Sequence, residues 1–162
     1  MLVLEPDHGP VTEAVGGGLS RVMRPIAYKW IDKLIYKVVV PEGFLFDGAS
    51  IPRLFWTLLG LTPHGDMDGP ALIHDFIYHY QGQLPAGSVF CRQGGEWVPL
   101  TEPIPKSMAD NLLETLCVRM GVVGSVRSWL VWAAVAAFGG FAWRRDDEER
   151  KFAKIDTLAV QL

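Results

Sequence analysis

The strongest constraint on the fold is a pair of β-branched and aromatic segments near the start of the chain. Residues 26–30 read Ile-Ala-Tyr-Lys-Trp and residues 34–40 read Leu-Ile-Tyr-Lys-Val-Val-Val, with a short polar turn near Asp32-Lys33 between them. Side chains of these types are enriched in strands, and a short connection between two such segments is typical of a β-hairpin. The segment 44–46 adds a third short strand. The N-terminal third therefore predicts a small antiparallel sheet.

The rest of the chain predicts about four helices. One begins at Ser50-Ile51-Pro52 and runs to about residue 59, because serine caps helix starts and proline fits the first turn. The others are expected at about 70–81, 106–120 and 125–143. Together these elements predict an α+β fold in which the small sheet packs against about four helices.

Length and composition predict one folded domain. The chain has 162 residues, of which 49% are hydrophobic and 20% are charged, and this balance argues against disorder. We expect a globular domain over 1–145 and a charged tail over 146–162. Between the helices, residues 85–103 are interrupted by glycine and proline, and Gly94-Gly95 predicts a small hairpin there. Gly16-Gly17-Gly18 separates a short head from the first strand.

Net charge and the N-terminal sequence restrict the partners and the cell compartment that we expect. The net charge is −3, and no Lys/Arg tract is longer than the pair Arg144-Arg145, so the basic surface expected of a dedicated nucleic-acid binder is missing. The N-terminus has no basic region ahead of an apolar run, and the two cysteines form no CxxC motif. We therefore expect no nucleic-acid partner and a reducing, cytoplasmic environment.

Two polar clusters interrupt apolar sequence and point to one site. The first spans Asp47 to Arg53, and the second is centred on His74-Asp75 in the helix predicted at 70–81. Polar side chains among apolar neighbours are costly unless they are hydrogen-bonded, paired or bound to a metal. At about 100° per residue, His74 and Tyr78 share one helix face. The clustering therefore requires a specific structural or chemical cause.

These clusters, with Lys106 and Asp110, resemble the pattern of a phage and prophage family known as domain of unknown function thirteen fifty-three. Val40-Pro41-Glu42-Gly43-Phe44 matches the end of the family's hydrophobic strand, and Asp47 to Pro52 matches its serine motif. His74-Asp75-Phe76 matches its helix motif, whereas Lys106 stands where arginine is usual. The resemblance implies a phage or prophage origin. We expect the protein in the cytoplasm of the bacterial host or in the virion.

The leading chemical interpretation is a metal-dependent hydrolase. Imidazole nitrogen and carboxylate oxygen together suit Zn²⁺, Mn²⁺ or Fe²⁺, which would activate a water for hydrolysis. The residues that act as metal ligands or general base are Asp47, His74, Asp75 and Asp110. The side chains that hold the substrate are Arg53, Tyr78 and Lys106. A second interpretation makes Ser50 a nucleophile, with His74 as base and Asp75 or Asp110 orienting it.

A rival interpretation is purely structural. Asp47 caps the helix that begins near Ser50, His74 is hydrogen-bonded in the core, and Asp75 pairs with Arg53 or Lys106. Ion pairs and helix caps alone produce such clusters. The protein is then non-catalytic and acts as a tail-associated virion protein or a host-interaction protein.

The last predicted helix contains an uncharged run over 129–143 with tryptophan at both ends. At about 1.5 Å per residue it rises only about 22 Å, short of the ~30 Å hydrocarbon core of a bilayer. We therefore favour a core helix, or a face of the 125–143 helix that binds another phage protein or a host protein, over membrane association. Gly139-Gly140 predicts a kink or a close approach.

Overall fold

The structure is a computed structural model that describes residues 2–4, 9–17, 19–46 and 68–119, together with helical residues at positions 129, 132, 133, 135–137, 139, 140 and 143. The described elements are, in order, β1 (Leu2–Leu4), β2 (Thr12–Gly16), β3 (Leu19–Val22), β4 (Ile26–Ile31), β5 (Ile35–Val40), β6 (Leu45–Phe46), α2 (Asp68–His79), β7 (Val89–Gln93), β8 (Glu96–Pro99) and α3 (Lys106–Arg119).

A five-stranded antiparallel sheet forms the centre of the fold, in the order β1-β4-β5-β7-β8. The predicted hairpin lies at its middle, where β4 and β5 pair from Ile26 opposite Val40 to Ile31 opposite Ile35. Along β4 the side chains alternate between buried and half-buried, because successive residues of a strand point to opposite faces. One face of the sheet therefore enters the core, and the other lies outside it.

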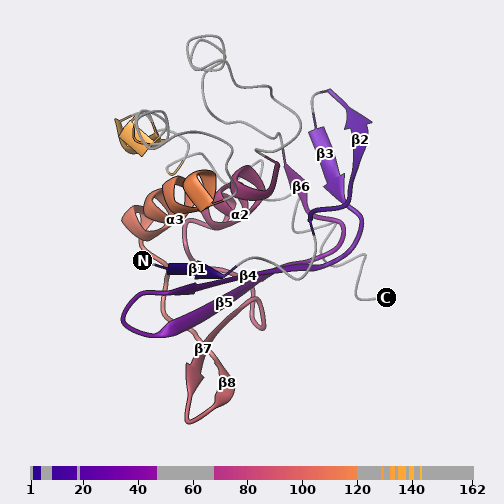
Figure 1. The fold of residues 1–162 in the computed structure, drawn as a ribbon. Helices are drawn as coiled ribbons and strands as arrows, with labels where there is room; N and C mark the ends of the chain where they lie inside the picture. Colours follow the sequence, from indigo (N-terminus) through magenta and orange to yellow (C-terminus); the bar gives the residue numbers. More distant parts are fainter. Residues whose placement is uncertain are drawn as a thin grey trace.

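A second, smaller sheet contains three antiparallel strands in the order β2-β3-β6 and lies to the right of the helices in Figure 1. Gly16 and Gly17 adopt φ angles of 95° and 63° where the chain leaves β2 for β3. Glycine reaches this left-handed region without the steric cost that a Cβ atom would bring. The glycine run therefore turns a hairpin.

Helices α2 and α3 contact each other and cover one face of the five-stranded sheet (Figure 1). The core between these layers contains large, fully buried side chains, among them Trp30 from β4, Phe76 from α2 and Leu112 from α3. Burial of one such side chain stabilises the fold by about 1.5–3 kcal/mol. The helix pair and the sheet are therefore held together by apolar contact, and the polar residues of α2 and α3 are placed by it.

The chain after helix α2 passes through a contact that only glycine allows. Gly82 has a φ angle of 76°, and its carbonyl oxygen accepts a hydrogen bond from the amide of Ile104 at 3.0 Å. A Cβ atom at position 82 would lie 1.9 Å from the carbonyl oxygen of Ile104. Because Ile104 comes just before α3, this contact fixes where α3 begins relative to the end of α2.

The predicted fold class, a small sheet packed on about four helices, is wrong. The described residues form two antiparallel sheets with eight strands, and two complete helices, α2 and α3. The head before residue 26 accounts for part of the difference, because it forms β1, β2 and β3. The predicted hairpin at 85–103 is present as β7 and β8, but it pairs with β5 and so extends the large sheet.

Other predictions of secondary structure are confirmed. The helices expected at 70–81 and 106–120 are α2 and α3, and the described residues between 129 and 143 are helical. The helix predicted from Ser50 and the tail over 146–162 lie outside the described residues. Within the part of the chain that the structure describes, no helix is long and apolar enough to cross a membrane.

Candidate functional site

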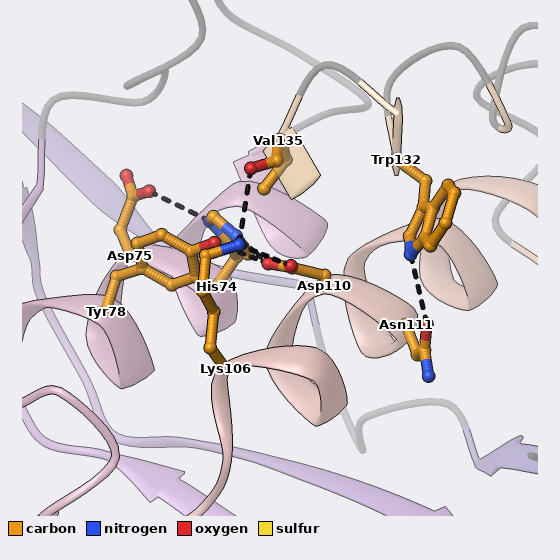
Figure 2. A network of polar contacts seen from close by, with 8 residues as sticks. All are labelled: His74, Asp75, Tyr78, Lys106, Asp110, Asn111, Trp132 and Val135. Atoms are coloured by element: carbon orange, nitrogen blue, oxygen red, sulfur yellow. Dashed lines mark hydrogen bonds and ion pairs between the residues drawn. The ribbon is translucent and has the colours of Figure 1, made fainter. Parts of the chain in front are cut away.

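Five of the predicted site residues meet where α2 and α3 touch (Figure 2). His74 and Tyr78 lie one turn apart on α2, so their side chains share a face of that helix. Lys106 and Asp110 are related in the same way on α3. Asp75 follows His74 and contacts its ring. The packing of the two helices therefore brings groups from distant parts of the chain into one buried cluster.

Asp110 is the centre of this cluster. Its Oδ1 accepts a hydrogen bond from the hydroxyl of Tyr78 at 2.5 Å, and its Oδ2 accepts one from Nζ of Lys106 at 2.7 Å. Asp110 is only 4% exposed, and charge-assisted hydrogen bonds of this kind are the strong ones in proteins. Both carboxylate oxygens are thus engaged inside the fold, and together they join α2 to α3.

His74 lies between two carboxylates. Its Nδ1 is 3.6 Å from Oδ1 of Asp75, and its Nε2 is 3.6 Å from Oδ1 of Asp110. Its ring is tilted against that of Tyr78, with the ring centroids 4.0 Å apart. The imidazole is 5% exposed, and its Nε2 has no hydrogen-bond partner among the described residues. Electrostatic attraction, rather than a short hydrogen bond, therefore links this ring to Asp110.

These neighbours shift the pKa values of the cluster in opposite directions. Burial alone lowers the pKa of His74, but Asp110 and Asp75 together outweigh it and hold this pKa above the usual 6.5. Burial alone raises the pKa of Asp110, but His74, Lys106 and Tyr78 outweigh it and hold this pKa below the usual 3.8. Burial, and then Asp110, raises the pKa of Tyr78. Near neutral pH, Asp110 is therefore a carboxylate and Tyr78 a neutral donor.

Helical residues between 129 and 143 close the cluster on a third side. The carbonyl oxygen of Val135 accepts a hydrogen bond from Nζ of Lys106 at 3.4 Å (Figure 2). The ring of Trp143 meets that of Tyr78 edge-on, with the centroids 4.9 Å apart. A Cβ atom at Gly139 would lie 2.6 Å from the hydroxyl oxygen of Tyr78. Tyr78 is therefore confined between α3 and this helical segment.

The sequence did not reveal most of these closing contacts. Trp132 donates its indole N–H to Oδ1 of Asn111 at 3.0 Å, and no spacing rule connects positions that far apart in the chain. The Gly139-Gly140 pair did carry a signal, since it predicted a close approach. That approach is confirmed at Gly139, which lies against the hydroxyl end of Tyr78.

Five of the eight predicted site residues lie in this cluster. The structure brings together His74, Asp75, Tyr78, Lys106 and Asp110. Asp47, Ser50 and Arg53 lie outside the described residues. The metal ligand at Asp47, the nucleophile at Ser50 and the substrate contact at Arg53 therefore stay predictions.

The described part of the cluster is a closed ionic network. Across the described ranges, no group of three or more His, Cys, Asp and Glu side chains is placed to hold a metal ion. The ammonium of Lys106 already supplies the positive charge beside Asp110. A metal ion at the same carboxylate would be repelled by that ammonium, most strongly in a buried site of low dielectric constant. The arrangement is therefore suited to holding the helices together.

Comparison with known proteins yields one match. The model of a family described as "Protein of unknown function (DUF1353)" matches residues 20–135, which is more than half of the chain. This range contains all the motifs that suggested the resemblance. No curated protein and no solved structure matches the chain.

Proposed function

Since the chain belongs to the family described as "Protein of unknown function (DUF1353)", we propose its function from its own geometry. The protein is a non-catalytic, phage- or prophage-encoded protein that acts by binding a virion protein or a host protein. Its polar cluster stabilises the fold and does not react with a substrate. This is the interpretation that the described contacts support best.

The closure of the charges around Asp110 is the observation that carries this conclusion. A catalytic carboxylate or imidazole must touch the reacting atoms, yet His74, Tyr78 and Asp110 are each at most 6% exposed. Both oxygens of Asp110 accept hydrogen bonds from side chains of the same fold. A substrate that reached this carboxylate would have to displace Lys106 or Tyr78, and would leave a buried charge unpaired.

An exposed apolar helix face supports a binding role. Trp129 is 55% exposed, and Ala136, which follows it by seven residues on the same helix face, is also exposed. The sequence has no charged residue between Arg127 and Arg144. Tryptophan is enriched among the residues that contribute most to protein–protein binding. The partner class is therefore a protein with a complementary apolar surface, in the virion or in the host cell.

Elemental analysis of tag-free protein tests the non-catalytic assignment. Wild type, His74→Ala and the control His79→Ala are each incubated with Zn²⁺ and Mn²⁺, dialysed and measured for metal content and thermal unfolding. We expect no stoichiometric metal in any of the three, and a lower melting temperature for His74→Ala. About one metal ion per chain in wild type and in His79→Ala, lost in His74→Ala, would overturn the assignment and call for a hydrolase screen.

Substitution at Trp129 tests the binding role. In cells that produce the phage, we expect wild-type chain to purify with virions, or to be cross-linked to one defined host protein. Trp129→Glu should abolish that association while the melting temperature stays unchanged. Association that is the same in the variant would contradict a role for this helix face.

A metal-dependent hydrolase is the second candidate, and one observation favours it. The Nε2 atom of His74 is buried without a hydrogen-bond partner among the described residues, and neutral imidazole nitrogen is a common metal ligand. In this alternative the ligands are Asp47, His74, Asp75 and Asp110, and Lys106 must leave Asp110 for the metal to bind. The same elemental analysis separates the two candidates.

A further inference from the structure

The outer face of the five-stranded sheet carries a second group of cations and aromatic rings. Lys37 on β5 lies opposite Phe90 on β7, and Arg92 on β7 lies opposite Trp97 on β8. Residues that are opposite each other, or two apart on one strand, share a face of a sheet. All four side chains therefore lie on one face, opposite to the face that holds the buried Val38 and Cys91. We call this group the outer cluster.

Short contacts organise the outer cluster. Nζ of Lys37 lies 4.5 Å from the ring centroid of Phe90 and 4.7 Å from that of Trp97. The guanidinium carbon of Arg92 lies 5.9 Å from the Trp97 ring centroid. Nε of Arg92 also donates a hydrogen bond to the carbonyl oxygen of Gly95 at 3.3 Å, which holds the guanidinium near the ring. The terminal nitrogens of Arg92 retain four further N–H donors.

On the described strands, the outer cluster has no counter-charge on its own sheet face. Among the described residues of β4, β5, β7 and β8, that face carries lysine and arginine but no aspartate or glutamate, and Glu96 lies on the other face. Arg92 is exposed, and Lys37, Phe90 and Trp97 are half-buried. Figure 1 shows β7 and β8 extending away from the two helices. The outer cluster is thus a local positive surface on a chain whose net charge is −3.

We propose that the outer cluster is a binding site for single-stranded nucleic acid. Phosphate groups pair with lysine and arginine, and unpaired bases stack on aromatic rings and on guanidinium planes. Both kinds of group are interleaved here on one sheet face. An acidic protein segment would pair with the two cations, but it would place no group to stack on the rings of Phe90 and Trp97. This inference is independent of the proposed protein-binding role.

The prediction of no nucleic-acid partner rested on net charge, which averages over the whole surface, and on the lack of a basic tract. Lys37 and Arg92 lie far apart in sequence and form no tract. The register of β5, β7 and β8 places them on one sheet face. A patch of this origin is invisible to a search for consecutive basic residues.

Fluorescence anisotropy of labelled oligodeoxythymidine with the full chain tests the site. We expect saturable binding near 50 mM salt, weakening with a slope of about −1.4 in log affinity against log salt for two phosphate contacts at about 0.7 each. Lys37→Ala and Arg92→Ala should each reduce that slope by about 0.7. Trp97→Ala should weaken binding about 5- to 150-fold, whereas Trp97→Phe should keep most of the affinity.

Arg24→Ala is the matched control, because Arg24 is an exposed arginine outside the five-stranded sheet. It should bind like wild type, and circular dichroism must show every variant folded. No binding near 50 mM salt, or a loss with Arg24→Ala equal to that with Arg92→Ala, would overturn the site. Displacement by poly-glutamate at concentrations below those of unlabelled oligonucleotide would overturn it in favour of an acidic protein partner.

Discussion

Lys106 and Lys37 have the same side chain in contrasting surroundings. Nζ of Lys106 lies 5.5 Å from the ring centroid of Tyr78 and 2.7 Å from a carboxylate oxygen of Asp110. Nζ of Lys37 lies beside the rings of Phe90 and Trp97, with no carboxylate on its sheet face among the described strands. The first cation is neutralised by a carboxylate of the fold, and the second has aromatic rings as its described neighbours.

The difference comes from what covers each cluster. Lys106 stands between two helices and a third helical segment, where an unpaired charge would be costly, so a buried carboxylate accompanies it. Lys37 is half-buried like Lys106, but it lies on the sheet face away from α2 and α3, where aromatic rings are its described neighbours. Lys106 is therefore paired with a carboxylate in the buried cluster, whereas no carboxylate lies on the sheet face of Lys37 among the described strands.

Removal of the Asp110 carboxylate should have the largest effect on stability. Asp110→Ala leaves the half-buried Lys106 without its carboxylate and leaves Asp75 as the carboxylate beside His74, and we expect the free energy of unfolding to fall by about 3–5 kcal/mol. Urea titration measures this loss. Glu114→Ala, one turn further along α3 and half-buried, is the control and should cost less than about 1 kcal/mol. Equal losses in the two variants would show that the pairing around Asp110 contributes nothing.

A methyl group at Gly139 should have the next largest effect. Its Cβ would lie 2.6 Å from the hydroxyl oxygen and 3.1 Å from a ring carbon of Tyr78. Gly139→Ala should therefore displace Tyr78 from Asp110 at a cost of about 1–3 kcal/mol. Gly140→Ala is the matched control, because no heavy atom lies within 4 Å of its Cβ position. Since alanine favours helix, the control should leave stability equal or higher by up to about 1 kcal/mol. A destabilised Gly140→Ala would contradict this difference.

The fold shows what local sequence determines and what it does not. The pattern of β-branched residues located β4 and β5 correctly, and the start and stop signals located α2 and α3. Strand partnership was not predictable, because the pairing of β5 with β7 joins residues about fifty positions apart. The glycine run at 16–18 fits both a linker and a hairpin turn, and only the partner strand decides between them.

The candidate site also has features that the sequence predicts and features that it does not. His74 and Tyr78, like Lys106 and Asp110, follow from helical spacing, so their shared faces were predictable. The partner that each of these groups binds was not predictable. Whether Asp110 binds a metal or a lysine depends on the packing of α2 against α3, and residue types alone allow both outcomes. Contacts made through the backbone, such as Lys106 with the carbonyl oxygen of Val135, leave no mark in the sequence.

The pH dependence of stability should distinguish the buried cluster from the outer cluster. The pKa of His74 is raised above 6.5, so the folded protein keeps a proton that the unfolded chain releases. This stabilisation is complete below about pH 6.5 and is lost as pH rises through the raised pKa, with a slope of at most about 1.4 kcal/mol per pH unit.

Urea titrations between about pH 5.5 and pH 9 measure that slope. His74→Gln should abolish it, whereas Trp97→Phe should leave it unchanged. Asp110 does not interfere, because its pKa is lowered from 3.8 and its stabilisation is lost only as pH falls through that lower value. A His74→Gln variant with the wild-type slope would mean that another group titrates.

The smallest effect is expected at Lys37, and this expectation is the sharpest test of the comparison. Lys37→Met keeps an unbranched side chain over Phe90 and Trp97 and removes only the charge, so stability should change by less than about 1 kcal/mol. Lys106→Met makes the same change beside Asp110 and should cost about 2 kcal/mol or more, because the carboxylate loses its cation. Urea titration of both variants beside wild type measures the difference. If the two losses in the free energy of unfolding were equal, Lys37 would stabilise the fold as much as Lys106 does. The charge of Lys37 would then serve stability rather than ligand binding.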